Sequence, residues 1–317
     1  MKKILCAVLA LAAMTSCSND YTIDYNKQAI AFGEAFVDNS TRADYSSGED
    51  IEAFKVYGTL TGDNGSGNTV QIFNNANVAR PTGLADGVYD PTMAWICTEV
   101  QYWVPNADYE FAAIVDGEAT ATPGLPVTIP FTVTDGDGDL LYATATAETD
   151  ANGTPDVDLV AFTFDHLLSK VQFTVANKMA ADYSIEVTGI TVGGVTDKGV
   201  YTVSGGTWAK ATDAATVPSL TFGTTDVIAS ANTDVASETR QILPVEQELA
   251  VTIAYDIYYG GSTKISAATK SGTIPAQTYL KNTVYNITAE IDANKIEFTV
   301  DSVNGFNTPV IEDEVEY

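Results

Sequence analysis

Bulky and small residues alternate along a short stretch near the start of the chain. Between Gln28 and Asp38 the even positions Ile30, Phe32 and Phe36 are bulky, whereas the odd positions carry only Ala, Gly or Val. Alternation with a period of two residues is typical of a β-strand that buries one face. The pattern therefore predicts a strand here, with the three bulky side chains on one face.

The same period recurs in the second half of the chain. Between Ser184 and Val192 it predicts a strand whose buried face carries Ile185, Val187, Gly189 and Thr191. Similar runs recur between turns rich in Gly, Asn and Asp, and no stretch after residue 16 shows sustained helical periodicity. These features predict an all-β protein.

The cleanest alternation lies near the C-terminus. One strand would carry on a single face the apolar residues Tyr285, Ile287, Ala289 and Ile291. After a turn at 292–294, a last strand would carry on a single face Ile296, Phe298 and Val300. An exposed strand at the edge of a sheet is a template for pairing with another chain.

The N-terminus has the features of a secretory signal. Lys2 and Lys3 precede an apolar run, Ile4 to Met14, that is too short to span a bilayer as a mature helix. The following Met14-Thr15-Ser16-Cys17 resembles a bacterial lipobox. We expect residues 1–16 to be removed and Cys17 to carry lipid, because two or more acyl chains anchor a protein stably. The alternative is a soluble secreted protein whose cysteine stands there by chance.

Cysteine and histidine are scarce. Cys6 would leave with the signal and Cys17 would be lipidated, so Cys97 alone remains and no intramolecular disulfide can form. We expect Cys97 to be a small buried apolar residue. A catalytic thiol would need a base, and the only histidine is His166. We expect His166 to be structural, at a corner between a strand and a turn, and we expect no enzyme activity and no cofactor.

Charge and length narrow the class further. The chain has 15 Lys and Arg against 42 Asp and Glu, a net charge of −27 and a pI near 4.1. Nucleic acid and anionic membrane surfaces are therefore poor partners. The length after the signal suits two domains, with a linker expected at Asp150 to Asp158.

An acidic run, Asp135 to Asp139, invites comparison with calcium-binding loops. An EF-hand would need Gly at the sixth position and Glu at the twelfth, where this chain has Leu140 and Thr146. We expect a solvated acidic turn and no metal site.

Three tryptophans, Trp95, Trp103 and Trp208, have two interpretations. They could form a platform on which sugars stack, or they could fill the core of a β-sandwich. The second interpretation is favoured because large aromatic residues fill cores more often.

Several segments together resemble one known family. Asp165 to Phe173 is similar to the F-x-H-x-L-S-K-V-x-F signature of the fimbrillins, the FimA-type or Mfa-like lipoprotein pilins of Bacteroidales type V pili. The order and spacing of further motifs agree across most of the chain: Ile30-Ala31-Phe32, Thr41-Arg42-Ala43, Phe54 to Gly58, Tyr102 to Phe111, Ile274 to Tyr279 and Asn282 to Ile287. One departure is that the family often ends near a tryptophan, whereas this chain has Phe306 and an acidic tail, 311–317.

The resemblance implies two tandem transthyretin-like β-sandwich domains, at residues 43–157 and 158–317. It also implies a lipidated leader, residues 17–42, whose strand completes the first domain until an arginine-specific protease cuts between Arg42 and Ala43. Other pilin subunits would then polymerise with it by strand exchange, with Ile296, Phe298 and Val300 on a donor strand. The implied place is the outer membrane, the cell surface and the fimbrium. The motifs do not separate stalk, tip and anchor subunits.

A different function is also compatible with the sequence. A monomeric surface lipoprotein could bind a glycan or another host ligand through Trp95, Trp103 or Trp208 without polymerising. Mutation of Arg42 would separate the two functions, because it would stop assembly and leave such a binding site intact.

Overall fold

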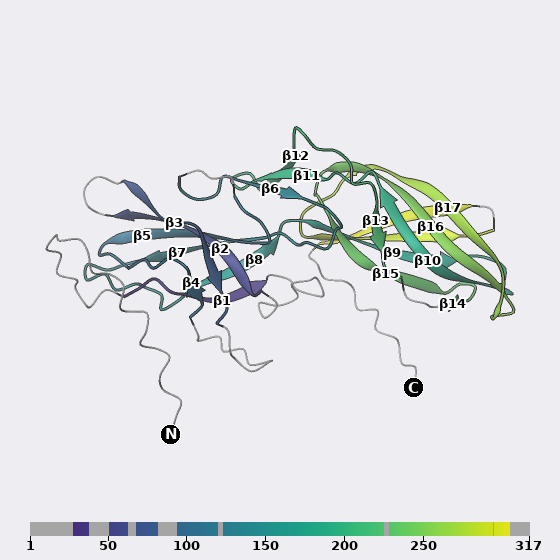
Figure 1. Cartoon of the computed structure of the whole chain (residues 1–317), viewed down its shortest axis with the longest axis horizontal. Coiled ribbons are helices and arrows are strands. Elements are labelled where there is room, and N and C mark those ends of the chain that lie inside the picture. Colours follow the sequence, from purple (N-terminus) through teal and green to yellow (C-terminus); the bar gives the residue numbers. More distant parts are fainter. Residues whose placement is uncertain are drawn as a thin grey trace, which may run out of the picture.

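The computed structural model describes residues 28–37, 51–62, 68–81, 94–119, 123–224, 228–293 and 295–304. All regular elements within these ranges are β-strands, which confirms the all-β class. No helix in the described part of the chain is long and apolar enough to cross a membrane. Figure 1 shows the strands of the first half at one end of an elongated molecule and most of those of the second half at the other.

A seven-stranded sheet organises the first half. Its strands, in spatial order, are β1 (Phe32–Val37), β8 (Val160–His166), β7 (Leu141–Glu148), β5 (Ala107–Val115), β2 (Ala53–Gly62), β3 (Thr69–Ala79) and β4 (Ile96–Cys97). Strand β1 runs parallel to β8, and the other neighbours are antiparallel.

The segment expected as a linker, Asp150 to Asp158, connects two neighbouring strands of this sheet. The Asp150 carboxylate accepts hydrogen bonds from the backbone N–H groups of Asn152 and Thr154, at 2.8 Å each. Such side-chain bonds to nearby backbone define a tight turn. Strand β8, expected to open the second half, therefore lies in the first sheet, and the chain leaves that sheet only after His166.

Three smaller sheets complete the described structure. One contains β15 (Asp234–Ile242), β9 (Ser169–Asn177), β18 (Thr283–Ile291) and β19 (Ile296–Asn304). A second contains β13 (Leu220–Phe222), β10 (Tyr183–Gly193), β16 (Glu246–Tyr259) and β17 (Thr263–Thr278), with β14 (Ile228–Ala229) also on β10. The third, between the two ends of the molecule, contains β12 (Thr207–Lys210), β11 (Lys198–Thr202) and β6 (Thr128–Thr132).

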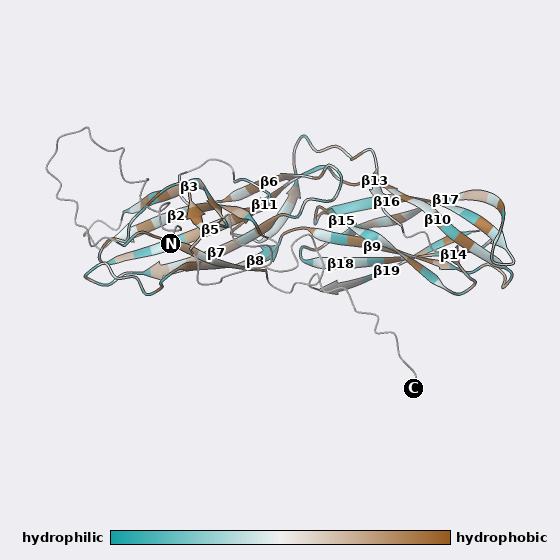
Figure 2. Cartoon of the chain, turned by 60° about the horizontal axis from the view of Figure 1, so that its bottom comes forward, coloured by the Kyte–Doolittle hydropathy of each residue, from teal (hydrophilic) through white to brown (hydrophobic). Residues whose placement is uncertain are grey.

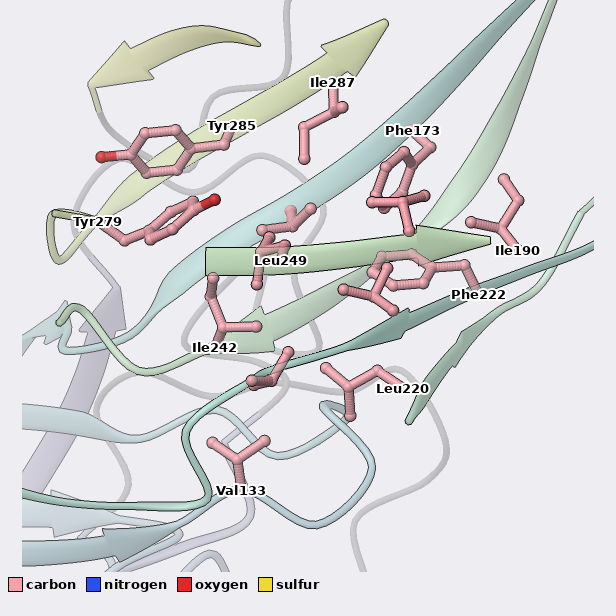
Figure 3. Packing of buried hydrophobic residues seen from close by; sticks show 14 of the residues in the cluster. Val133, Phe173, Ile190, Leu220, Phe222, Ile242, Leu249, Tyr279, Tyr285 and Ile287 are labelled. Carbon is pink, nitrogen blue, oxygen red and sulfur yellow. The ribbon is translucent and has the colours of Figure 1, made fainter. Parts of the chain in front are cut away.

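Apolar side chains form two separate buried clusters. Hydrophilic and hydrophobic residues alternate along many strands in both halves (Figure 2), so each sheet can bury one face. In the larger cluster, side chains from β9 and β18 meet those from β10, β13 and β16 (Figure 3). Phe173 and Phe222, from two different sheets, pack edge to face with ring centroids 4.9 Å apart.

Strand β10 departs from the expected alternation. Ile185 and Val187 are buried as expected, but the register shifts before Gly189, and Ile190 and Val192 are the next buried residues. A β-bulge inserts one residue and moves every later side chain to the opposite face. The expected burial of Gly189 and Thr191 on that face was therefore wrong.

Candidate functional site

The leader segment, defined here as the described residues 28–37, is hydrogen-bonded along both edges. On one side β1 pairs with β8, and the N–H of Val160 donates to the carbonyl of Ala31. On the other side the N–H of Ile30 donates to the carbonyl of Gln101, and the N–H of Trp95 donates to the carbonyl of Phe32. Each of these bonds is 2.8–2.9 Å long. The leader therefore fills a slot between β8 and the segment 95–103.

The side chain of Phe32 lies at the centre of an aromatic cluster. It is fully buried and stacks on Phe162 of β8, with centroids 6.1 Å apart and planes 19° apart. Its ring also meets, edge to face, the rings of Phe54, Phe73 and Phe111. Each such contact adds to the burial of apolar area. The first buried cluster is thus completed by a residue of the leader.

Phe36 does not share the face of Ile30 and Phe32. Ile30 and Phe32 are buried, whereas 46% of Phe36 is exposed. The register shifts between Phe32 and Ala35, so Ala35 takes the next inward position. Gly33 occupies this irregular stretch, where an added Cβ would lie 2.8 Å from a side-chain carbon of Leu159. A bulge in the leader therefore corrects the expectation that Phe36 faces the core.

The expected processing residues Cys17, Arg42 and Ala43 lie outside the described residues. The chain has only two other arginines, Arg80 and Arg240. The backbone N–H of Arg80 donates to the carbonyl of Glu52, and its guanidinium lies 5.4 Å from the centre of the Trp95 ring. Arg240 is paired with Val171 within β15 and β9, and it also binds Asp137 at 2.9 Å. Both of these arginines are thus held in sheet structure.

His166 forms a buried pair with an unexpected partner. Its Nδ1 atom lies 2.8 Å from Oδ2 of Asp139, and both side chains are fully buried. Asp139 belongs to the acidic run that was expected to be a solvated turn, so that expectation was wrong for this residue. Asp137 instead forms a salt bridge with Arg240 at the surface. The carboxylates of the run therefore bind separate cationic or polar groups.

Cys97 is half-buried rather than fully buried. Burial, more than the neighbouring Glu99, raises the pKa of its thiol. A raised pKa lowers the thiolate fraction at neutral pH and therefore the nucleophilicity of the group. The imidazole nitrogen of His166 that could serve as a base is instead held by Asp139.

The tryptophans are parts of the packed structure. Trp95 and Trp103 are buried, and the ring of Trp103 packs against Tyr109 with centroids 4.6 Å apart. The half-buried Trp208 donates its indole N–H to the carbonyl of Leu167, at 2.8 Å. Stacking on a sugar needs an exposed ring face, so Trp95 and Trp103 cannot provide the expected platform.

The expected donor residues lie in β19, at the edge of the four-stranded sheet. Ile296, Phe298 and Val300 are half-buried and pack against the larger cluster, whereas the intervening residues are exposed. The expected alternation of this strand is thus confirmed. Its neighbour β18 buries Tyr285, Ile287, Ala289 and Ile291, also as expected.

Comparisons with known proteins agree with this architecture. The family model described as "Fimbrillin-like" matches residues 41–304. A fimbrial protein from Bacteroides vulgatus has 19% sequence identity and a TM-score of 0.58, with 89% of this chain and 100% of that chain covered. A proposed cell adhesion protein from Bacteroides uniformis has 17% identity and a TM-score of 0.53, with 88% and 98% covered. Another from Bacteroides ovatus has 13% identity and a TM-score of 0.54, with 89% and 99% covered. No curated protein matches the chain.

Proposed function

Because this chain belongs to the fimbrillin-like family, we propose that it is a structural or adhesive subunit of a surface fimbria. It is made as a lipoprotein, anchored to the outer membrane through Cys17 and displayed at the cell surface. An arginine-specific protease cuts after Arg42, the leader is lost, and a strand from a neighbouring subunit takes its place. Head-to-tail contacts of this kind do not close, so they produce a filament.

The observation that carries this proposal is the double-edged pairing of the leader. Residues 28–37 are bonded to β8 on one side and to the segment 95–103 on the other. Loss of this strand would expose two rows of backbone groups and the aromatic cluster around Phe32. An unpaired edge beside an apolar groove is the structure into which an added strand binds.

Side chains of the leader set the strength and the register of the exchange. Burial of a large apolar side chain contributes about 1.5–3 kcal/mol, so Ile30 and Phe32 hold the uncut leader firmly. The inward positions are residues 30, 32 and 35, because of the bulge after Phe32. A donor strand with bulky residues at steps of two fills the first two pockets, and it needs a similar bulge to fill the third.

Strand β19 has the pattern required of the donor. Ile296, Phe298 and Val300 recur at steps of two, and β19 is bonded through its backbone to β18 alone among the described strands. Its release would break a single ladder. That ladder joins Val303 to Val284 at one end and Ile296 to Ile291 at the other.

The position of the arginines makes the proteolytic step testable. A protease binds several residues in extended form, so it cuts segments held in a sheet slowly. Arg80 and Arg240 are held in this way, and Arg80 is followed by Pro81. We expect an arginine-specific protease to make one rapid cut in the purified precursor, after Arg42.

Size analysis in SDS without boiling then reports assembly. We expect the cut wild-type chain to form ladders, the Arg42→Ala variant to stay an uncut, folded monomer, and the Arg80→Lys variant to behave as wild type. A chain that lacks Lys295 to Tyr317 should be cut but should form no ladder. Ladders from Arg42→Ala, or from the C-terminal deletion alone, would contradict the mechanism.

A further inference from the structure

Strand β17 has one edge that no described strand covers. It runs for 16 residues, Thr263–Thr278, and among the described strands it pairs only with β16. Most of its side chains are exposed, including 52% of Ile265. A long exposed edge strand would pair with other chains unless something covers it.

The charge of β17 is opposite to that of the protein as a whole. Its sequence, TKISAATKSGTIPAQT, contains two lysines and no carboxylate, in a chain with a net charge of −27. Lys264 is already paired with Asp256 of β16. Lys270, half-buried, has no salt-bridge partner among the described residues. The strand therefore favours an acidic partner.

The end of the chain has the pattern of an acidic strand. Residues 310–317 read VIEDEVEY, with Glu312, Glu314 and Glu316 at alternate positions. Ile311, Val315 and Tyr317 alternate with them, so one face would be acidic and the other largely apolar. The preceding residues, GFNTP at 305–309, are typical of a turn.

The described structure ends where this segment could reach β17. Strand β18 begins four residues after β17 ends, and Val303 of β19 pairs with Val284 near the start of β18. Strands β17 and β19 therefore finish at the same end of the sandwich. They are close across it, because a Cβ added at Gly272 would lie 2.6 Å from the Phe298 ring. Facing sheets lie about 10 Å apart, and five extended residues span up to about 17 Å.

We propose that residues 310–317 pair, antiparallel and within the same molecule, with the free edge of β17. Residues 305–309 reverse the chain after Asn304, and the tail runs back from Thr278 toward Lys270. The glutamates then lie beside the one strand that offers uncompensated lysine charge. Pro275 has no N–H to donate, so the backbone bonds form on either side of it.

This contact protects the folded subunit. It covers the edge through which two copies would otherwise pair side by side, while β19 and the leader stay as described. It does not depend on cleavage after Arg42 or on lipid at Cys17, so it can be tested apart from the fimbrial function.

Amide hydrogen exchange tests the pairing directly. The full-length precursor is compared with a chain that ends at Asn304, and the peptides that cover Lys270 to Thr278 are followed. We expect exchange there to be at least about tenfold slower in the full-length chain, because paired amides exchange only on opening. Addition of a synthetic peptide of residues 305–317 to the shortened chain should restore the protection.

Charge variants of the full-length chain provide the controls. Replacement of Glu312, Glu314 and Glu316 together by Lys should remove the protection, as should Lys270→Glu. Lys210→Glu, in the exposed strand β12, should leave it unchanged. Equal exchange in the full-length and shortened chains would overturn the proposal. Protection that appears only as the protein concentration rises would also overturn it, because the tail would then belong to a second copy.

Discussion

The imidazole of His166 and the carboxylate of Asp139 share a hydrogen bond of 2.8 Å, with both side chains fully buried. His166 ends β8, the strand that pairs with the leader, and Asp139 lies just before β7. The backbone of His166 also pairs with Leu141, and the N–H of Leu167 donates to the carbonyl of Leu140. The pair thus fixes the end of β8 against the start of β7.

A first prediction is that His166→Gln destabilises the protein without altering any binding per folded molecule. Loss of a buried hydrogen bond to a charged group costs about 1.5–3 kcal/mol, so the urea midpoint and the Tm should fall. Asp137→Asn is the matched control, because its surface salt bridge with Arg240 is worth about 1 kcal/mol or less. A loss of binding or turnover at unchanged stability would show that His166 has a role beyond structure.

A second prediction separates two phenylalanines of the leader. Phe32→Ala should lower the free energy of unfolding of the uncut precursor by about 3–5 kcal/mol, as expected for a buried aromatic side chain. Phe36→Ala should change it by about 0.5 kcal/mol or less, because the side chain is half exposed. Urea titration of the two variants gives the comparison. Equal losses would show that the bulge after Phe32 is absent in solution.

A third prediction concerns anchoring. Cys17→Ala should abolish metabolic labelling with fatty acid and retention in the membrane fraction, because lipid at Cys17 is the proposed anchor. Cys97→Ala is the matched control and should keep both properties, since this half-buried thiol lies within the folded structure. Partitioning of the Cys17→Ala chain into a detergent phase would disprove the lipobox assignment.

A fourth prediction concerns alkaline pH. Burial, with a smaller contribution from Tyr201, raises the pKa of Tyr142 to about 12 from its ordinary value of 10.0. Between these values the folded state holds a proton that the unfolded state has lost, so stability falls as the pH rises from 10 to 12. Tyr142→Phe should make this fall shallower, whereas Phe at the exposed Tyr102 should not. Thermal melts across this pH range measure the slope.

The sequence alone was sufficient for the features that depend on local pattern. Uninterrupted alternation from Tyr285 to Val300 predicted both faces of the last hairpin, because β18 and β19 pair without a register shift. The recurrent β-branched runs and turns predicted the all-β class. The motif around His166 predicted the family, which the match over residues 41–304 confirms.

The tertiary structure alone decided the features that depend on which strand lies alongside. Bulges after Phe32 and Val187 reversed the faces of Phe36 and Thr191, and a bulge depends on the register with the partner strand rather than on periodicity. Burial likewise depends on distant neighbours, so a five-residue acidic run could contain a solvated Asp137 and a fully buried Asp139. The slot of the leader has the same origin, because it is formed by β8 and the segment 95–103, which lie far from the leader in sequence and meet it only in the fold.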